Sequence, residues 1–451
     1  MLEHRHSLKG SRTAVALLVA LIMVATLPGS ASSKKKAPAP APAKMDLSRF
    51  VWPKAPAITR IKFLDFFSAE KRDSTNQKKK SGWMDRMAGV SAENDKRTRP
   101  HFELLTPFGL AVDSKGLLYV ADSKVGAIFI FNPETHDVQL LKHGVDAQFS
   151  SVFGLAIDDN DQLLVTDGNL HHVLVFDPNH KLRVRFGEGI LEEPSGIAID
   201  TENRFIYVAD TGLDQIVVFD ADSFKPLRTI GTAGKQHTLT TPGDFSKPTN
   251  VAVDQDGNLY VSDTMNNRVE IFDADGKFIR TFGKNGDGPG DFQRPKGIAV
   301  DVDGHIWVAD AMLCQLKVFT ADGQLLMAMG GFGLLPGQFQ AVVGLTIDKN
   351  NRVFTTEQLP GRVQMFRYIT NAEAQVEYDR RKAEVEFKRQ QEKTSGGANS
   401  PAAAPGANAP QQNSGVKPAA QKQAPPASRQ RETGPEAATW PRYRQFLWLF
   451  L

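Results

Sequence analysis

The feature that most constrains the fold is a sequence unit that recurs six times between residues 107 and 357. Each copy has an apolar segment, a short polar turn and a second apolar segment that ends in an acidic residue, as in "PKGIAVDVDGHIWVAD" from Pro295. The closing acidic residues are Asp122, Asp167, Asp210, Asp263, Asp310 and Glu357, at steps of 45, 43, 53, 47 and 47 residues. Self-similarity at a period of about 20–50 residues indicates stacked repeats.

Each unit reads as four short strands. A first apolar strand and a second strand flank a turn rich in Asp, Asn and Gly, which tolerate positive φ. The third strand alternates, as in "VEIFD" from Val269 and "LKVFT" from Leu316, a pattern typical of a half-buried strand. A fourth strand follows, such as "FIRTFG" from Phe278. Four antiparallel strands per unit predict an all-β fold, a six-bladed β-propeller over residues 57–370.

The ring must also close. The sixth unit ends near Thr370 without a fourth strand, whereas "RIKFLDFFS" from Arg60 alternates like the other fourth strands. We therefore predict that residues 57–70 complete blade six from the other end of the chain, which leaves no open sheet edge in the ring. Residues 71–104 show no strand pattern and are predicted to be an insertion before blade one.

Three connectors between units share a glycine-rich pattern. "PGDF" occurs at Pro242 and at Pro289, and "PGQF" occurs at Pro336. A phosphate-binding loop needs a strand, a glycine turn and then a helix, and no helical pattern follows any of the three. The pattern instead predicts blade-to-blade crossovers, with Phe245 and Phe292 and the matching Phe339 wedged between neighbouring blades.

The repeat "PTNVAVDQDGNLYVSDTMNNRVEIFD" from Pro248 resembles the NHL repeat, a family of six-bladed propellers, and the resemblance covers about residues 57–370. Asn250 stands where the family usually has Gly, and unit six has Val342 and Glu357 in place of Pro and Asp. The resemblance implies a six-bladed propeller. It also admits lyases and lactone hydrolases that hold a metal at the central channel, although their aligned His and carboxylate ligands are not recognisable in this sequence.

The N-terminal region predicts export. Residues 1–31 combine a basic start, an uncharged apolar run over residues 14–27 and small residues at its exit, which is the pattern of a signal peptide. The segment is either cleaved or kept as a membrane anchor. Export places the protein in the periplasm, in the cell envelope or outside the cell. A Pro/Ala/Lys linker is predicted over residues 32–56.

The C-terminal region departs from the repeat. Residues 371–393 predict a charged helix, and residues 394–436 are Ala-, Pro-, Gln- and Ser-rich, which predicts disorder. Residues 437–451 form an aromatic tail that either docks on a partner or a membrane surface or is an artefact of the reading frame.

Charge argues against nucleic-acid binding. Residues 101–370 contain 22 Lys and Arg against 35 Asp and Glu, a formal net charge of −13, and the rest of the chain carries +16. Nucleic-acid binding needs a basic face. The basic flanks, with "KKK" at residues 34–36 and 78–80, either contact anionic lipid or an acidic partner or are solvated tails. We expect a monomeric propeller.

One candidate binding site follows from the position after the first residue of each first strand. First strands are innermost in a propeller, so these residues should gather round one mouth of the central channel. They differ from one another, as residues of a binding surface do: Phe108, Phe153, Ser195, Thr249, Lys296 and Val343. The alternative is ordinary variation in an exposed loop.

A second candidate set lies in the turns before the third strands, which we expect on the opposite face of the disc. Its members are His171, His172, Asn267, Arg268 and Cys314, the only cysteine. Gly, Asn and Asp at the matching positions of other units predict a left-handed turn residue. The adjacent histidines are either a metal or acid–base pair or a turn and its neighbour. The repeated acidic residues either ring the channel and bind cations or accept N–H bonds from the turns.

Function follows from these patterns only in outline. We expect no catalytic residue, metal or cofactor, since a catalytic zinc site needs three convergent ligands and no such set is visible. A single cysteine excludes the Cys/His zinc domains of NHL-containing ubiquitin ligases. The sequence favours a non-enzymatic scaffold of the cell envelope that binds a protein or another envelope ligand on one propeller face. The alternative is a propeller lyase or lactone hydrolase with a metal at the channel.

Overall fold

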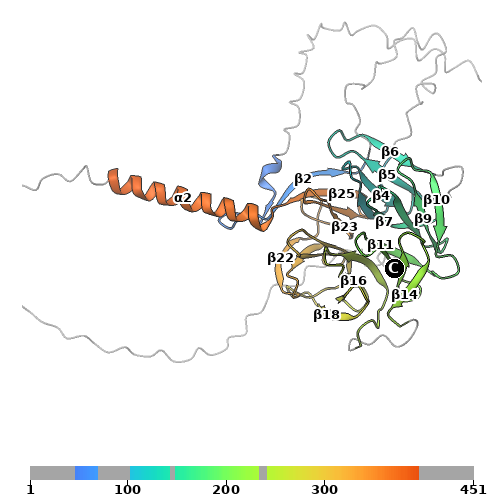
Figure 1. Cartoon of the computed structure of the whole chain (residues 1–451). Coiled ribbons are helices and arrows are strands. Elements are labelled where there is room, and N and C mark those ends of the chain that lie inside the picture. Colours follow the sequence, from blue (N-terminus) through green and yellow to red (C-terminus); the bar gives the residue numbers. More distant parts are fainter. Residues whose placement is uncertain (1–45, 70–101, 143–147, 233–240, 396–451) are drawn as a thin grey trace, which may run out of the picture. The chain divides into compact units, whose positions relative to one another are not determined.

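The computed structural model describes residues 46–69, 102–142, 148–232 and 241–395, and the described strands form six sheets around a common centre (Figure 1). The predicted signal, nearly all of the 71–104 insertion, the low-complexity segment and the aromatic tail lie outside these residues. No described helix has the length and apolar character of a membrane span.

Blades one to three each contain four antiparallel strands in sequence order. Blade one consists of β3 (Pro107–Val112), β4 (Leu118–Asp122), β5 (Ala127–Phe131) and β6 (Val138–Leu141). Blade two consists of β7 (Val152–Ile157), β8 (Leu163–Asp167), β9 (His172–Phe176) and β10 (Leu182–Phe186). Blade three consists of β11 (Pro194–Asp200), β12 (Phe205–Asp210), β13 (Gln215–Asp220) and β14 (Pro226–Ile230).

Blades four and five repeat this order, and blade six takes strands from both ends of the propeller. Blade four consists of β15 (Pro248–Val253), β16 (Leu259–Asp263), β17 (Arg268–Phe272) and β18 (Phe278–Phe282). Blade five consists of β19 (Pro295–Val300), β20 (Ile306–Asp310), β21 (Gln315–Phe319) and β22 (Leu325–Gly330). Blade six consists of β23 (Val342–Ile347), β24 (Arg352–Glu357), β25 (Arg362–Tyr368), β2 (Ile61–Phe67) and β1 (Val51–Trp52).

The first strands line the centre of the ring. Each contacts the first strand of the next blade, and β23 contacts β3, so the six-bladed ring is closed. The predicted fold class is therefore confirmed. Pro107 at the start of β3 pairs with Asp122 at the end of β4. We call the face that holds these strand ends and the blade-to-blade connectors the crossover face, and the face that holds the turns between first and second strands the hairpin face.

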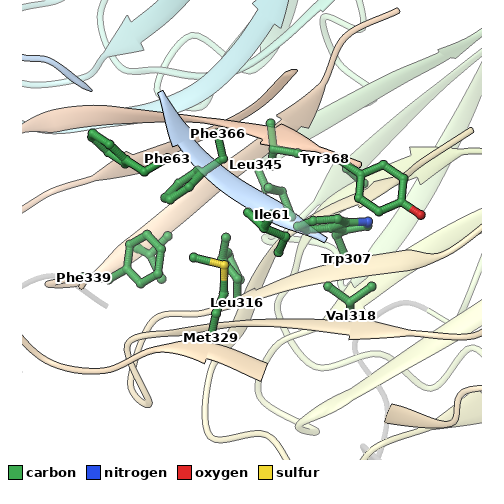
Figure 2. Close-up of a cluster of buried hydrophobic side chains, with 14 of the residues drawn as sticks. Ile61, Phe63, Trp307, Leu316, Val318, Met329, Phe339, Leu345, Phe366 and Tyr368 are labelled. Carbon is green, nitrogen blue, oxygen red and sulfur yellow. The ribbon is translucent and has the colours of Figure 1, made fainter. Parts of the chain in front are cut away.

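Blade six is completed by the N-terminal strand β2, which pairs with β25 along residues 61–67. Figure 2 shows Ile61 and Phe63 of β2 in one buried cluster with Trp307 of blade five and Phe366 of blade six. This cluster ties the two ends of the ring together by apolar burial. The linker predicted over residues 32–56 was wrong in its last part, because Leu47, Phe50 and Trp52 pack against this cluster and β1 extends the sheet.

The three phenylalanines of the glycine-rich connectors lie between blades. Phe292 is fully buried and its ring contacts Phe282 of blade four and Phe319 of blade five, with centroids 6.3 and 5.4 Å away. Phe245 is buried in the apolar cluster between blades three and four, and Phe339 in the cluster between blades five and six. Burial between two sheets is the wedge that the sequence predicts.

A polar side chain in the third strand anchors each of these connectors. In blade four, Glu270 accepts a hydrogen bond from the N–H of Gly243 at 2.8 Å. In blade five, the ammonium of Lys317 donates to the carbonyl of Asp291 at 2.5 Å. The matching residue of blade six, Gln364, accepts from Gly337 and donates to Gln338. The matching positions of blades one to three hold Phe129, Leu174 and Val217.

The repeated acidic residues are structural. Asp122 is fully buried, and its two carboxylate oxygens accept the N–H groups of Leu105 and Thr106 before β3 and of Lys124 and Val125 after β4. Asp167, Asp210 and Asp310 make the same pattern of contacts. These carboxylates join a connector to a turn. This agrees with the interpretation that the repeated acidic residues accept N–H bonds from the turns.

Helix α2 (Asn371–Ser395) follows β25, two residues longer than predicted. Thr370 and Glu373 form a capping box: the hydroxyl of Thr370 accepts the N–H of Glu373, and the carboxylate of Glu373 accepts the N–H of Thr370. Ala374 in the first turn is buried, whereas most of the later side chains are exposed, which fits the charged sequence.

Candidate ligand-binding mouth of the central channel

The six variable residues that the sequence singles out surround the channel on the crossover face, one at the start of each innermost strand. The glycine that follows each of them in most blades has a steric cause. A Cβ on Gly109 would lie 2.3 Å from the carbonyl oxygen of Phe153, and one on Gly154 would lie 2.2 Å from that of Ser195. The inner strands approach most closely at this end, so the mouth is narrow and its walls are backbone.

Three of the six residues serve the fold. The hydroxyl of Ser195 donates to the carbonyl of Thr249 at 2.9 Å, and the hydroxyls of Thr249 and Thr264 lie 2.7 Å apart. The first bond joins blades three and four at the mouth, and the second lies within blade four. Val343 is only 3% exposed, so its prediction as a channel-mouth contact was wrong: its side chain packs inside the protein. Phe108, Phe153 and Lys296 remain as the half-exposed residues whose side chains make no such bonds.

Phe108 and Phe153 form an edge-to-face pair with centroids 4.9 Å apart and planes at 90°. The ring of Phe153 lies over Gly168, where a Cβ would come within 2.7 Å of the ring. The other five blades carry Ser, Thr, Ala or Gln at the position of Gly168. The missing side chain at Gly168 therefore makes room for an aromatic pair on the rim of the channel.

Lys296 lies on the opposite part of the rim, in blade five. It keeps partial access to solvent through the channel, yet protein surrounds it, and this burial together with the nearby Arg294 lowers the pKa of its ammonium. Within the described residues its ammonium has neither a hydrogen bond nor an ion pair. A cation without a protein partner, held in a confined site, favours an anionic ligand.

The second candidate set lies on the crossover face as well, so its assignment to the opposite face was wrong. The antiparallel pairing of first and second strands brings the turn after each second strand beside the start of the first strand. The turn geometry itself is as predicted: all six residues have positive φ, between 55° and 79°, namely Gly126, His171, Asp214, Asn267, Cys314 and Gly361.

Burial removes most of the second set from a ligand's reach. Asn267, Arg268 and Cys314 are at most 7% exposed. Arg268 is held in the protein by Asp263 at 2.8 Å and Glu270 at 3.1 Å. Burial raises the pKa of the Cys314 thiol and so disfavours the thiolate, which is the reactive form.

The adjacent histidines lie in different environments. His172 is buried and burial lowers the pKa of its imidazole, whereas His171 is exposed and its Nδ1 contacts the backbone carbonyl of Glu192. This outcome matches the interpretation of an exposed turn residue and its neighbour.

One group of potential metal ligands in the described part of the chain lies outside the two candidate sets predicted from the sequence. Asp301, Asp303 and His305 bring ligand atoms within 4.8 Å of one another at the hairpin end of blade five. These atoms already have partners: Asp301 accepts from the indole of Trp307 at 2.8 Å, and Asp303 accepts from the hydroxyl of Tyr368 at 2.6 Å. The sequence signal was the Asp-x-Asp-x-His spacing, but Tyr368 comes from blade six and only the fold brings it there.

The hairpin face has an acidic hollow of about 290 Å³ where blades one, two and six meet. Asp113, Asp158 and Asp348 line it, each at the end of an innermost strand. Each carboxylate accepts backbone N–H groups of its own hairpin, and Asp348 also pairs with Arg352 at 2.6 Å. These contacts identify the three acidic residues as parts of the hairpin turns.

Comparisons with known proteins give the same architecture. The sequence model of a family described as "6-bladed beta-propeller" matches residues 238–323. The chain is a six-bladed β-propeller. The propeller is 33% identical over 99 residues to a probable peptidyl-alpha-hydroxyglycine alpha-amidating lyase of Caenorhabditis elegans, a match that covers 21% of this chain and 26% of that protein. The chain thus spans about a quarter of the length of this curated relative.

Solved propellers are similar at low identity. The structure of virginiamycin B lyase from Staphylococcus aureus has 15% identity and a TM-score of 0.43, covering 58% of this chain and 95% of that one. A gluconolactonase from Xanthomonas campestris has 18% identity and a TM-score of 0.46, covering 59% and 86%.

The described residues at the channel do not fit a bound metal. The mouth on the crossover face holds phenylalanines and a lysine, which repels a cation. The carboxylates that line the hollow on the hairpin face already have protein partners. Asp113, Asp158 and Asp348 accept from their own hairpins, Asp161 accepts from Ser114 of blade one, and Asp159 pairs with Arg204 of blade three. We therefore derive no metal-dependent step for this propeller.

Proposed function

We propose that the chain is a non-enzymatic binding protein of the cell envelope that holds its partner at the channel mouth on the crossover face. The observation that carries the proposal is Lys296, a confined ammonium without a protein partner among the described residues, on the same rim as the Phe108–Phe153 pair. The partner presents an anionic group to Lys296 and an apolar group to the phenylalanines. The predicted export signal is the basis for the location.

The lowered pKa of Lys296 supports this role. Burial disfavours the charged ammonium, and a bound carboxylate would stabilise the charged form by pairing with it. Binding should therefore weaken as pH rises through the pKa of the free lysine, which lies below its ordinary value.

A test uses an array of octapeptides that each carry one carboxylate and one aromatic side chain at varied spacing. The wild-type chain should bind a subset, and Lys296→Met and Phe153→Ala should each lose most of that signal. Lys277→Met, an exposed lysine in a hairpin on the other face, is the matched control. Equal binding by all four proteins would refute the proposed site.

The runner-up function is a propeller lyase or lactone hydrolase. The local similarity to the probable amidating lyase of C. elegans favours it. Metal analysis of the purified full chain decides between the two: stoichiometric zinc or calcium that disappears with a defined set of ligand substitutions would support the enzyme.

A further inference from the structure

The connector that enters blade six exposes a cluster of apolar side chains. Phe332 is 76% exposed, Leu334 58% and Leu335 52%. We call residues 331–337 the blade-six loop. It has no charged residue, and its sequence is "GFGLLPG".

The connector into blade five makes the same backbone hydrogen bonds as the blade-six loop. The N–H of Phe292 bonds to the carbonyl of Lys284, and the N–H of Phe339 bonds to that of Gly331, each at 2.9 Å. The return bonds also match, from Gly286 to Phe292 at 3.1 Å and from Gly333 to Phe339 at 3.2 Å. The two loops thus share these hydrogen bonds and differ in side chains and in the positive φ of Gly331 and Gly337.

The side chains show that the apolar cluster is not needed for these hydrogen bonds. In the blade-five connector, Asn285, Asp287 and Gly288 stand where the blade-six loop has Phe332, Leu334 and Leu335. The shared hydrogen bonds therefore do not depend on the three exposed apolar side chains. Contiguous apolar exposure of this kind marks an interaction surface.

The neighbours of the loop indicate what it contacts. The indole of Trp52 packs over Gly337, since a Cβ there would lie 2.1 Å from the ring. Trp52 belongs to a segment with two exposed cations, Arg49 and Lys54. This surface combines exposed Phe and Leu with a half-buried Trp and flanking cations. Surfaces that lie in the headgroup region of a bilayer have this composition.

We propose that the blade-six loop is a bilayer-contact site, in which Phe332, Leu334 and Leu335 enter the acyl boundary while Arg49 and Lys54 face anionic headgroups. The sequence before this segment supports a lipid occupant over a protein. The uncharged apolar run of residues 14–27 and the lysines of residues 34–36 precede Arg49 closely, and the residues from Lys36 to Arg49 span at most about 45 Å when extended. This inference rests on the loop and does not depend on the channel-mouth proposal.

The experiment reads out the loop itself in the full chain. Leu334→Cys and, as its matched control, Asp287→Cys are each labelled with an environment-sensitive fluorophore. Labelling is selective because Cys314, the only native cysteine, is buried. The probe is a vesicle of phosphatidylethanolamine and phosphatidylglycerol, with brominated lipid as the quencher in a second preparation.

The proposal expects a shift to shorter wavelength and quenching by brominated lipid for the label at position 334, and neither effect at position 287. Adding Phe332→Asn and Leu335→Gly, the residues of the sister loop, should abolish the shift at position 334 and leave the melting temperature unchanged. No shift with vesicles, or equal shifts at both positions, would overturn the proposal. A shift that depends on protein concentration without vesicles would assign the loop to a second copy, and one that is lost on deleting residues 437–451 would assign it to the tail.

Discussion

The charge state of the buried carboxylate of Glu270 should affect the stability of the whole propeller. Glu270 and Asp263 share the single guanidinium of Arg268 inside blade four, so the group carries a surplus negative charge. Blade six has the same arrangement with Glu357 and Arg362, but its third member is the neutral Gln364. The substitution Glu270→Gln gives blade four the balanced charge of blade six and keeps an acceptor for Gly243.

The magnitude follows from the pKa of Glu270, which burial raises from 4.5 to about 7. One pKa unit corresponds to about 1.4 kcal/mol, so the ionised form lowers the free energy of unfolding by up to about 3 kcal/mol. The folded chain keeps this proton where the unfolded chain has lost it. Stability from this group is therefore present below pH 4.5 and is lost as pH rises through 7.

The assay is urea unfolding of the full chain across this range. At about pH 8, Glu270→Gln should be more stable than the wild type by up to about 3 kcal/mol, and the difference should vanish near pH 4. Gln364→Glu should show the reverse, and Glu192→Gln, at an exposed position, should show no pH-dependent difference. A gain that is the same at both pH values, or a loss at pH 8, would refute the reasoning.

Three further predictions concern packing. Phe292→Ala should lower the free energy of unfolding by about 3–5 kcal/mol, because a fully buried ring between two blades is removed, and an unchanged melt would rule out the wedge. Deleting residues 57–70 should abolish most of the cooperative thermal transition, since β2 completes blade six; a normal melt would contradict closure by β2. Gly168→Ala should displace the ring of Phe153, so peptide-array binding should fall as in Phe153→Ala while the melt stays close to wild type.

The fold was predictable because the same four-strand pattern occurs in six units of the sequence. Turn residues at fixed offsets, such as Asn267 and Cys314, fall where every unit needs positive φ, so even an unusual residue there is recognised by its register. Closure by β2 was predictable from a missing strand at one end and a spare one at the other.

Other features depend on contacts between units. Alternation in "VEIFD" and "LKVFT" suggested a half-buried third strand, but Glu270 and Lys317 are at most 1% exposed because each bonds to a connector. The turn set lies on the crossover face because each second strand runs antiparallel to the first. Its end therefore returns to the face where the first strand begins. Burial of Arg268 and Val343 likewise depends on neighbouring segments, which no single unit encodes.

The anchors explain why only half of the ring uses the glycine-rich connector. Blades four, five and six carry Glu270, Lys317 and Gln364 in the third strand, and each bonds to the connector that enters its own blade. The first three blades have apolar residues at this position and connectors without the pattern. Connector and anchor form one module.

The most direct test of binding at the channel mouth is photocrosslinking from the two faces of the propeller in cells that express the chain. The photoreactive p-benzoylphenylalanine replaces Phe153 at the channel mouth or Val302, which is exposed on the hairpin face. We expect a discrete adduct from position 153 that disappears with Lys296→Met, and none from position 302. An adduct from position 302 alone, or one from position 153 that is indifferent to Lys296, would contradict binding at the channel mouth.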